Sequence, residues 1–319
     1  MSNGLFAIIV QRLTMGVFIL LGVSILITLG VENLSGDVCS AMLGQAAEAA
    51  TVAACQVELG LDRPVYIRYV DWLYNILQGD FGTSLANKRE VGEQIGKRLG
   101  NTLYLAAMTA MFAVPIGILL GVIAALYRNS FIDHLISTST LTTISSPEFF
   151  LAYVLMAIFA VNLNWLPAIS NVDSSMGFWA RLEVSALPVI TLTLVTVAHM
   201  MRMTRASIVN LLASPYIEMA KLKGLKPGRI IIKHALPNAW SPIIQVVVLN
   251  LAYMIVGVVV IEVVFVYPGL GALIVDAVLN RDLPVIQGTA IVFAAVYVLL
   301  FLLADVLSIL ANPRLRHRR

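Results

Sequence analysis

Long uncharged stretches separated by short polar segments dominate the chain. A helix needs about 20 apolar residues to cross the hydrocarbon core of a bilayer. Six uncharged runs approach or exceed that length: Leu13–Val31, Leu99–Tyr127, Phe149–Val172, Val184–Met201, Ala235–Ile261 and Leu283–Ala304. The third run is expected to begin nearer Leu135, so that it contains Glu148. Lipid offers the backbone no hydrogen-bond partners, and the short alternating segments of a membrane barrel are missing. We therefore predict an all-α polytopic membrane protein with six transmembrane helices.

The composition agrees with this pattern. Of the 319 residues, 59% are hydrophobic and 12% are charged, whereas a soluble domain carries about 25% charged residues. The first apolar run is as long as a membrane span and lacks the cleavage pattern of a signal peptide. We therefore expect it to remain in the protein as a helix.

Lysine and arginine are placed unevenly, which sets an orientation. The segment 202–233 holds seven basic residues against one acid, and the C-terminal tail adds Arg314, Arg316, Arg318 and Arg319. Because segments rich in Lys and Arg stay in the cytoplasm, both termini are expected there. The predicted parts are the N-terminus with the first helix (1–31), a large outer loop (32–98), the five remaining helices (99–311) and a basic cytoplasmic tail (312–319).

The two cysteines, Cys39 and Cys55, both fall in the outer loop. Disulfides form and persist outside the cytoplasm, and a bridge here would stabilise the loop by roughly 3 kcal/mol in the chain-entropy model. The alternative is two free thiols on one small helix, Ala41–Leu59. A metal site is not expected, because two cysteines without a nearby histidine make a poor zinc site.

One polar segment, within 208–240, contains several residues that signal the start or the end of a helix. Ser214 with Pro215 predicts a helix start with a capping hydroxyl, and Gly224 predicts a helix end in a left-handed turn. A second helix is expected from Lys226-Pro-Gly to Leu236-Pro237, where the chain re-enters the membrane. The spacing places four residues on one face of the first helix, with Glu218 free to meet a partner's arginine: Tyr216, Met219, Ala220 and Lys223. The alternative is a basic loop lying on anionic lipid headgroups.

These residues resemble a known motif. Glu218-Met-Ala220, then Gly224, and after nine residues His234-Ala-Leu236-Pro237, resemble the EAA loop of bacterial ABC-importer permeases. The general motif has Ala where this chain has Met219 and Ile where it has His234. The form His234–Asn238 is similar to the branch that transports dipeptides, oligopeptides and nickel. Further stretches resemble that branch: Leu59–Pro64, Gly79–Ser84, Asn164–Pro167, Glu262–Phe265, Pro268–Gly271, Asn280–Pro284 and Asp305 with Asn312–Arg316.

The resemblance implies a type I importer permease fold with a large periplasmic loop, in the bacterial inner membrane. It implies four kinds of partner: a second, similar permease, two ATPase subunits, a periplasmic substrate-binding protein and the lipid bilayer. The EAA loop would dock into an ATPase, so that ATP binding drives alternating access. The ATPase-coupling residues would be Tyr216, Glu218, Met219, Ala220, Lys223, Gly224, Leu236 and Pro237.

The chain itself is not expected to be an enzyme. It has no glycine-rich phosphate loop, so ATP and Mg would be bound by the partner ATPases, and neither a cofactor nor a nucleic-acid partner is expected. The family's solutes include dipeptides, oligopeptides, nickel chelates, opines, glutathione and some oligosaccharides, and nothing in the spans selects one. A secondary transporter or a channel is the rival, although the spans lack its intramembrane charge relays and filter sequences.

Polar residues in and beside the spans are further candidates. Glu148 either lines the translocation path or complements the dipole in the first turn of a restarted helix. Asn250 and Tyr253 lie three apart on one face, where they would line the path or bond between helices. Five residues are candidates for the periplasmic gate or the binding-protein contact: Glu262, Pro268, Gly269, Arg281 and Asp282. The alternative for Arg281 and Asp282 is that they are solvated loop charges.

Overall fold

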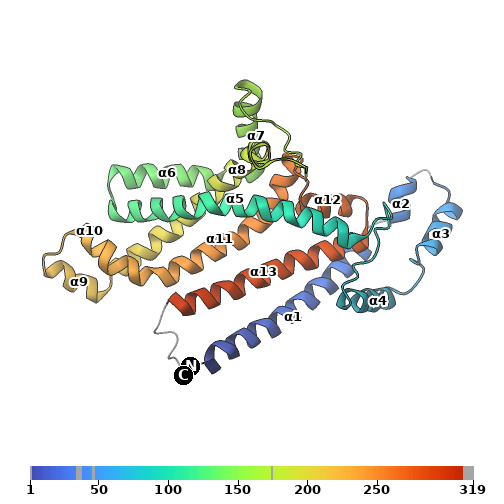
Figure 1. Cartoon of the computed structure of the whole chain (residues 1–319), viewed down its shortest axis with the longest axis horizontal. Coiled ribbons are helices and arrows are strands. Elements are labelled where there is room, and N and C mark those ends of the chain that lie inside the picture. The colour runs from blue at the N-terminus through green and yellow to red at the C-terminus, as the bar shows by residue number, and fades with distance from the viewer. Residues whose placement is uncertain (1, 34–37, 45–46, 174, 312–319) are drawn as a thin grey trace. The chain divides into compact units, whose positions relative to one another are not determined.

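The structure is a computed structural model that describes residues 2–33, 38–44, 47–173 and 175–311. Helices form almost all of its regular structure (Figure 1). Within the described residues the β pairing consists of an isolated bridge between Thr83 and Glu90. The all-α prediction is therefore confirmed. The predicted basic tail at 312–319 lies outside the described residues.

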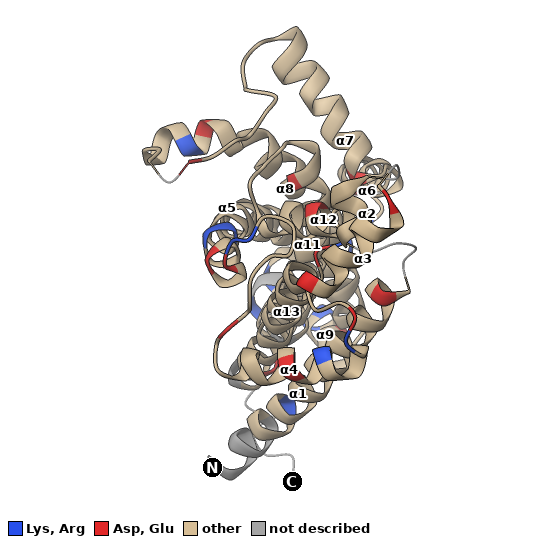
Figure 2. Cartoon of the chain, turned by 90° about the vertical axis from the view of Figure 1, so that its right-hand side faces the viewer, with Lys and Arg blue, Asp and Glu red and all other residues tan. Residues whose placement is uncertain are grey.

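Five long apolar helices correspond to five of the six predicted spans. They are α1 (Ser2–Glu32), α5 (Val91–Leu126), α8 (Phe178–Leu212), α11 (Leu236–Val264) and α13 (Leu283–Ala311). Each contains a stretch apolar and long enough to cross a membrane, and charged residues are sparse along them (Figure 2). Three of the five (α1, α5 and α8) begin earlier than the uncharged run predicted, and all but α5 end later, because a helix can continue through charged residues beyond the hydrocarbon core.

The third span is broken, which the hydropathy pattern did not predict. Helix α6 (Phe131–Ser145) ends at Ser146, and α7 (Glu148–Leu155) continues into a π-helix, η1 (Met156–Asn162), at 104° to α6. Pro147 lacks a backbone N–H and forces the preceding residue out of the helical region. Ser146 accordingly has φ −96° and ψ 132°. The prediction of a continuous third helix to Val172 is wrong, since residues 163–173 are irregular.

The outer loop contains three short helices: α2 (Val38–Leu43), α3 (Ala49–Glu58) and α4 (Val65–Leu77). Cys39 on α2 and Cys55 on α3 are joined by a disulfide, so the predicted bridge is present. The alternative of one helix over Ala41–Leu59 carrying free thiols is wrong. A further short helix, α12 (Leu270–Leu279), precedes α13.

The chain forms two compact units, each with its own core. The first takes its described residues from Met1–Leu13, Tyr104–Tyr267 and Tyr297–Arg319. Its main core gathers buried side chains of α5, α7, α8 and α11, among them Leu105, Leu187 and Ile261. The second takes Thr14–Leu103 and Pro268–Val296. Its core joins the start of α5 to α12 and α13, through residues such as Val91, Leu270 and Ile286.

Candidate functional site

The polar segment after α8 folds as two short helices at one end of α8 and α11 (Figure 1). Helix α9 (Pro215–Leu222) begins where the sequence predicts, with Ser214 extended at the N-cap and Pro215 in the first turn. The predicted capping hydroxyl is wrong. The Ser214 Oγ donates to the carbonyl of Leu211 and accepts nothing from the first turn of α9. The N-cap backbone, rather than its side chain, therefore starts this helix.

Gly224 ends α9 in the predicted left-handed turn, with φ +75°. The Gly224 N–H donates to the Lys221 carbonyl at 2.9 Å, and the Leu225 N–H donates to the Ala220 carbonyl at 3.3 Å. This pair of bonds is the Schellman motif, which satisfies the last carbonyls of a helix and favours glycine at this position. The turn after α9 is thus a fixed joint.

A small apolar core lies beneath α9. It consists of four buried residues, with Leu212 and Leu225 packed against them: Ile217, Ala220, Ile230 and Ala235. The prediction that Ala220 shares the outward face of α9 is wrong, because its side chain points into this core and only 7% of the residue is exposed. A small side chain here lets α9 lie close to its neighbours within the same chain.

The outward surface of α9 is apolar and ringed by charge. Tyr216, Met219 and Leu222 are exposed, with 76% exposure at Leu222. Glu218 and Lys223 are exposed beside them. Leu222 was missed by the sequence reasoning; its signal was a large aliphatic residue in the last turn of a short helix. Three exposed apolar side chains on an eight-residue helix make a compact apolar surface.

The segment is tied to the membrane helices at both ends. Helix α10 (Pro227–Ile230) passes through a π-helix, η2 (Ile231–Ala235), into α11, so the predicted second helix is confirmed. Leu212 packs in the core beneath α9 and also, with Leu236, in a cluster of α5, α8 and α11 built on Ile208 and Ile243. Pro237 lies exposed in the first turn of α11.

An ion pair that the sequence reasoning missed joins α6 to α8. Arg205 donates from Nε to Asp133 Oδ1 at 2.8 Å and from Nη2 to Asp133 Oδ2 at 2.7 Å. Asp133 also accepts from the Asn129 N–H at 2.9 Å and from the Ser137 hydroxyl at 3.2 Å. Asp133 is buried. Such a two-pronged pair fixes the relative orientation of the two side chains as well as their distance. The start of α6 is therefore held against α8 at Arg205, two turns before α8 ends.

The three proposed path residues lie in different surroundings. Glu148 stands in the first turn of α7, as its structural alternative predicts, and its carboxylate lies against Gly257 of α11. Asn250 is buried and donates to the Val246 carbonyl at 2.8 Å and to the Met203 sulfur at 3.6 Å. Tyr253 is exposed. Asn250 therefore links α11 to α8, while Tyr253 faces away from that contact.

Glu262 lies fully buried near the end of α11, where its backbone carbonyl accepts from the Tyr267 N–H at 2.8 Å. Tyr267 is also fully buried, and that burial raises its pKa to about 12 although a hydrogen bond with Arg181 opposes the shift. The Arg181 guanidinium lies 4.1 Å from the centre of the Tyr104 ring. Glu262 thus belongs to a packed polar cluster at the end of α11.

The turn at Pro268-Gly269 belongs to the second unit. The Asn101 side chain donates to the Pro268 carbonyl at 2.9 Å. The Leu270 N–H, the first of α12, donates to the Thr102 hydroxyl at 2.7 Å. Gly269 is extended, with φ −101°. Two consecutive residues of α5 therefore pin this turn from the side, which gives Pro268 and Gly269 a structural role in the fold.

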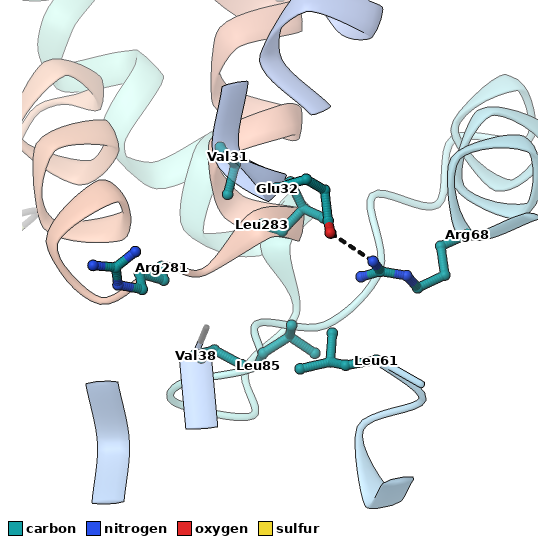
Figure 3. A pocket seen from close by; sticks show the side chains of 8 residues that line it. All are labelled: Val31, Glu32, Val38, Leu61, Arg68, Leu85, Arg281 and Leu283. Atoms are coloured by element: carbon teal, nitrogen blue, oxygen red, sulfur yellow. Dashed lines mark hydrogen bonds and ion pairs between the residues drawn. The ribbon is translucent and has the colours of Figure 1, made fainter. Parts of the chain in front are cut away.

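Asp282 is a buried clamp, not a solvated loop charge. It accepts from the Ser84 hydroxyl, from the Leu85 N–H at 3.1 Å and from the Ala86 N–H at 3.3 Å. Arg281 instead lines a cavity of about 80 Å³ with Val31, Glu32, Val38, Leu61, Arg68, Leu85 and Leu283. Figure 3 shows Glu32 and Arg68 facing one another there, joined by an ion pair of 2.6 Å.

Metal-binding side chains do not gather anywhere in the part of the chain that is described: no three His, Cys, Asp or Glu residues lie together there. The Asn164–Pro167 stretch lines an open cavity of about 490 Å³ with Glu183 on its wall. The segment after α8 thus presents the exposed surface of α9, a fixed turn at Gly224 and a direct connection to α8 and α11.

Comparison with known families gives two matches that together cover most of the chain. Residues 117–317 match the binding-protein-dependent transport system inner membrane component. Residues 5–106 match the N-terminal part of such membrane components. The glutathione transport system permease protein GsiC of Salmonella typhimurium is 38% identical over 299 residues, covering 94% of this chain and 95% of its own. GsiC of Escherichia coli K12 is 37% identical over 296 residues, covering 93% and 94%.

Among solved structures, the fold is similar to that of a chain from an inward-facing MetNI methionine ABC transporter. The TM-score is 0.56 at 17% identity, and the match covers 68% of this chain and 96% of that chain. At this identity the likeness concerns the fold alone. It agrees with the predicted type I importer permease architecture.

Proposed function

Because the chain belongs to the family of inner membrane components of binding-protein-dependent transport systems, we propose that it is the permease for glutathione or a closely related short peptide. The chain is a multi-pass permease of an ABC importer. The substrate assignment is supported by one observation, the similarity over nearly the whole length to glutathione permeases.

The proposed complex contains more than this chain. Transport that depends on a binding protein needs a substrate-binding protein and ATPase subunits. In our proposal this permease pairs with a second, similar permease, and both stand over two ATPases that bind ATP and Mg. The chain then has no cofactor of its own. Both of its termini and α9 lie on the cytoplasmic side, as the clustering of Lys and Arg favours.

Helix α9 is proposed to be the contact with an ATPase. Its exposed Tyr216, Met219 and Leu222 would enter a cleft of the ATPase, and Glu218 would meet an arginine at the rim. The Schellman turn and the core around Ile217 keep α9 in one orientation. Movement of an ATPase would then shift α8 and α11 and switch the access of the path.

Reconstitution tests the proposal. The chain is co-expressed with the second permease, the ATPases and the binding protein of the proposed complex, and the complex is placed in liposomes. We expect ATP-dependent uptake of radiolabelled glutathione, and unlabelled dipeptides reveal how wide the specificity is. Uptake of dipeptides but not glutathione would refute the substrate assignment alone. ATP-independent uptake by liposomes that hold only this chain would refute the role of a permease subunit.

A further inference from the structure

Helix α4 has three distinct faces. At about 100° per residue, one face carries Arg68, Asp71 and Asn75, and a second carries Tyr69 and Trp72, whose rings pack 6.0 Å apart between centroids. The third face carries four large apolar residues in a line along the helix: Tyr66, Val70, Tyr74 and Leu77. Each of these four is between 59% and 80% exposed. The third face therefore has no partner among the described residues, although it is apolar along its length.

Two contacts with α1 fix how α4 is turned. The Arg68 guanidinium donates to Glu32 at the end of α1, at 2.6 Å. The Tyr69 hydroxyl is hydrogen-bonded to the Ser24 hydroxyl at 2.7 Å. Ser24 lies eight residues before Glu32, or about 12 Å deeper along α1 at 1.5 Å per residue. Figure 1 shows α4 beside this part of α1.

The order of the faces around α4 then decides which one points to the membrane. Arg68 contacts Glu32 at the end of α1, and Tyr69 contacts Ser24 nearer the middle of α1. Rotation around α4 from Arg68 to Tyr69 therefore leads from the end of α1 toward the middle of its span. About a further quarter-turn in the same sense reaches the line of Tyr66, Val70 and Tyr74. The polar face is thus level with Glu32, and the exposed apolar face is directed toward the hydrocarbon.

We propose that α4 is an interfacial helix that lies in the lipid headgroup layer at the C-terminal end of α1. The depth agrees, because such helices bury their apolar face about 5–10 Å below the headgroups and α4 spans about 10 Å across with its side chains. The residue types agree as well, since tyrosine is enriched at membrane interfaces. The lipid-exposed surface of α1 ends beside it, with Leu26 and Leu29 both exposed.

The proposal commits to lipid as the occupant of this face. A protein partner that covered it would leave the same apolar residues buried but out of reach of lipid. The two cases differ in one measurable quantity, the accessibility of the face to small molecules dissolved in the membrane. This inference does not depend on which solute the permease carries.

Nitroxide labels at two positions, one in each of two variants, provide the test. The native cysteines are bonded to each other, so a single new cysteine takes the label in the full complex in nanodiscs of phosphatidylethanolamine and phosphatidylglycerol. Tyr74→Cys places a label on the apolar face. Asp71→Cys is the matched control on the polar face, and it removes only an exposed ion pair with Arg63, which contributes little.

We expect the label at 74 to collide with oxygen and to lose collisions with a water-soluble nickel chelate, and the label at 71 to show the reverse. Equal access of the nickel chelate to both labels would overturn the proposal, because the face would lie in water. Exclusion of both oxygen and nickel at 74 would also overturn it, because a protein would cover the face. Val70→Cys and Asn75→Cys repeat the comparison if the first pair fails to assemble.

Discussion

Replacing Gly224 with valine perturbs the joint after α9 through the backbone alone. At φ +75°, a Cβ added to this glycine meets no atom within 4 Å. Steric exclusion by neighbours is therefore not involved. A non-glycine residue in the left-handed region costs roughly 1–2 kcal/mol, and a β-branched one is especially disfavoured there. A cost of that size lowers the fraction of segments with the native turn by a factor of about 5–30.

The expected result is loss of coupling without loss of the protein. In proteoliposomes holding the full complex, Gly224→Val should reduce ATPase stimulation by the loaded binding protein, and uptake with it. Membrane insertion should survive because the spans are unchanged. Gly224→Asn should retain more activity, since asparagine tolerates the left-handed region.

Gly228→Val is the matched control. Gly228 lies in α10, its φ is outside the left-handed region, and a Cβ there meets nothing within 4 Å. Valine is no worse than glycine in a helix, so this variant should couple normally. Full stimulation of ATPase activity in Gly224→Val, with the complex intact, would refute the reasoning that the turn orients a docking helix.

Three further changes follow from contacts in the structure. Asp133→Ala leaves Arg205 without its two-pronged partner and should lower the free energy of unfolding by about 3 kcal/mol, the lower end for a buried pair because Arg205 remains partly exposed. Thermal unfolding in detergent measures this loss. If removing both Asp133 and Arg205 costs as much as the sum of the two single changes, the two residues are not coupled. Gly257→Ala places a Cβ 2.7 Å from a Glu148 carboxylate oxygen. Because that oxygen is at the end of a flexible side chain that can turn aside, the change should cost no more than about 1 kcal/mol, the lower end for overpacking. The same assay should show relief when Glu148→Ala is added, and no relief would mean that the two groups do not meet. Cys39→Ser opens the bridge between α2 and α3. The outer loop should lose roughly 3 kcal/mol of stability and become sensitive to added protease. A reducing agent should have the same effect on the wild type and no further effect on this variant.

Local signals in the sequence were sufficient for the start and end of α9. Pro215 suits the first turn of a helix and Gly224 suits a left-handed end, and both act through the backbone of their own residue. Five of the six predicted spans also followed from hydropathy. Hydropathy reports how a segment partitions into lipid, however, and not its direction, so the bend at Ser146-Pro147 went unpredicted although the proline was visible.

Contacts between distant residues were beyond reach of the sequence. Asp282 clamps Ser84, which is 198 positions away, and Asp133 pairs with Arg205 across 72 positions. Asp282 carries no local pattern that differs from an ordinary charged loop residue. The spacing of Ser130 and Asp133 marks the start of a helix, but it does not name Arg205 as the partner. The spacing of Tyr216, Met219 and Ala220 showed that they are neighbours on α9. It could not show that Ala220 turns toward Ile217 and the segment's own core.

These contacts give a physical reason why a movement of α9 would move the membrane helices with it. A docking helix on a loose loop would yield to its partner without moving the membrane helices. Here Leu212, the last residue of α8, packs both beneath α9 and against the start of α11. Asp133 and Arg205 add α6 to the same body. The turn at Gly224 connects α9 to α10, and the Schellman bonds hold it in one conformation. If α9 is the docking helix, the stiffness of this one turn should set how much of the ATPase movement reaches α8 and α11. The transport rates of variants at position 224 should then follow the order in which the substituted residues tolerate the left-handed backbone region.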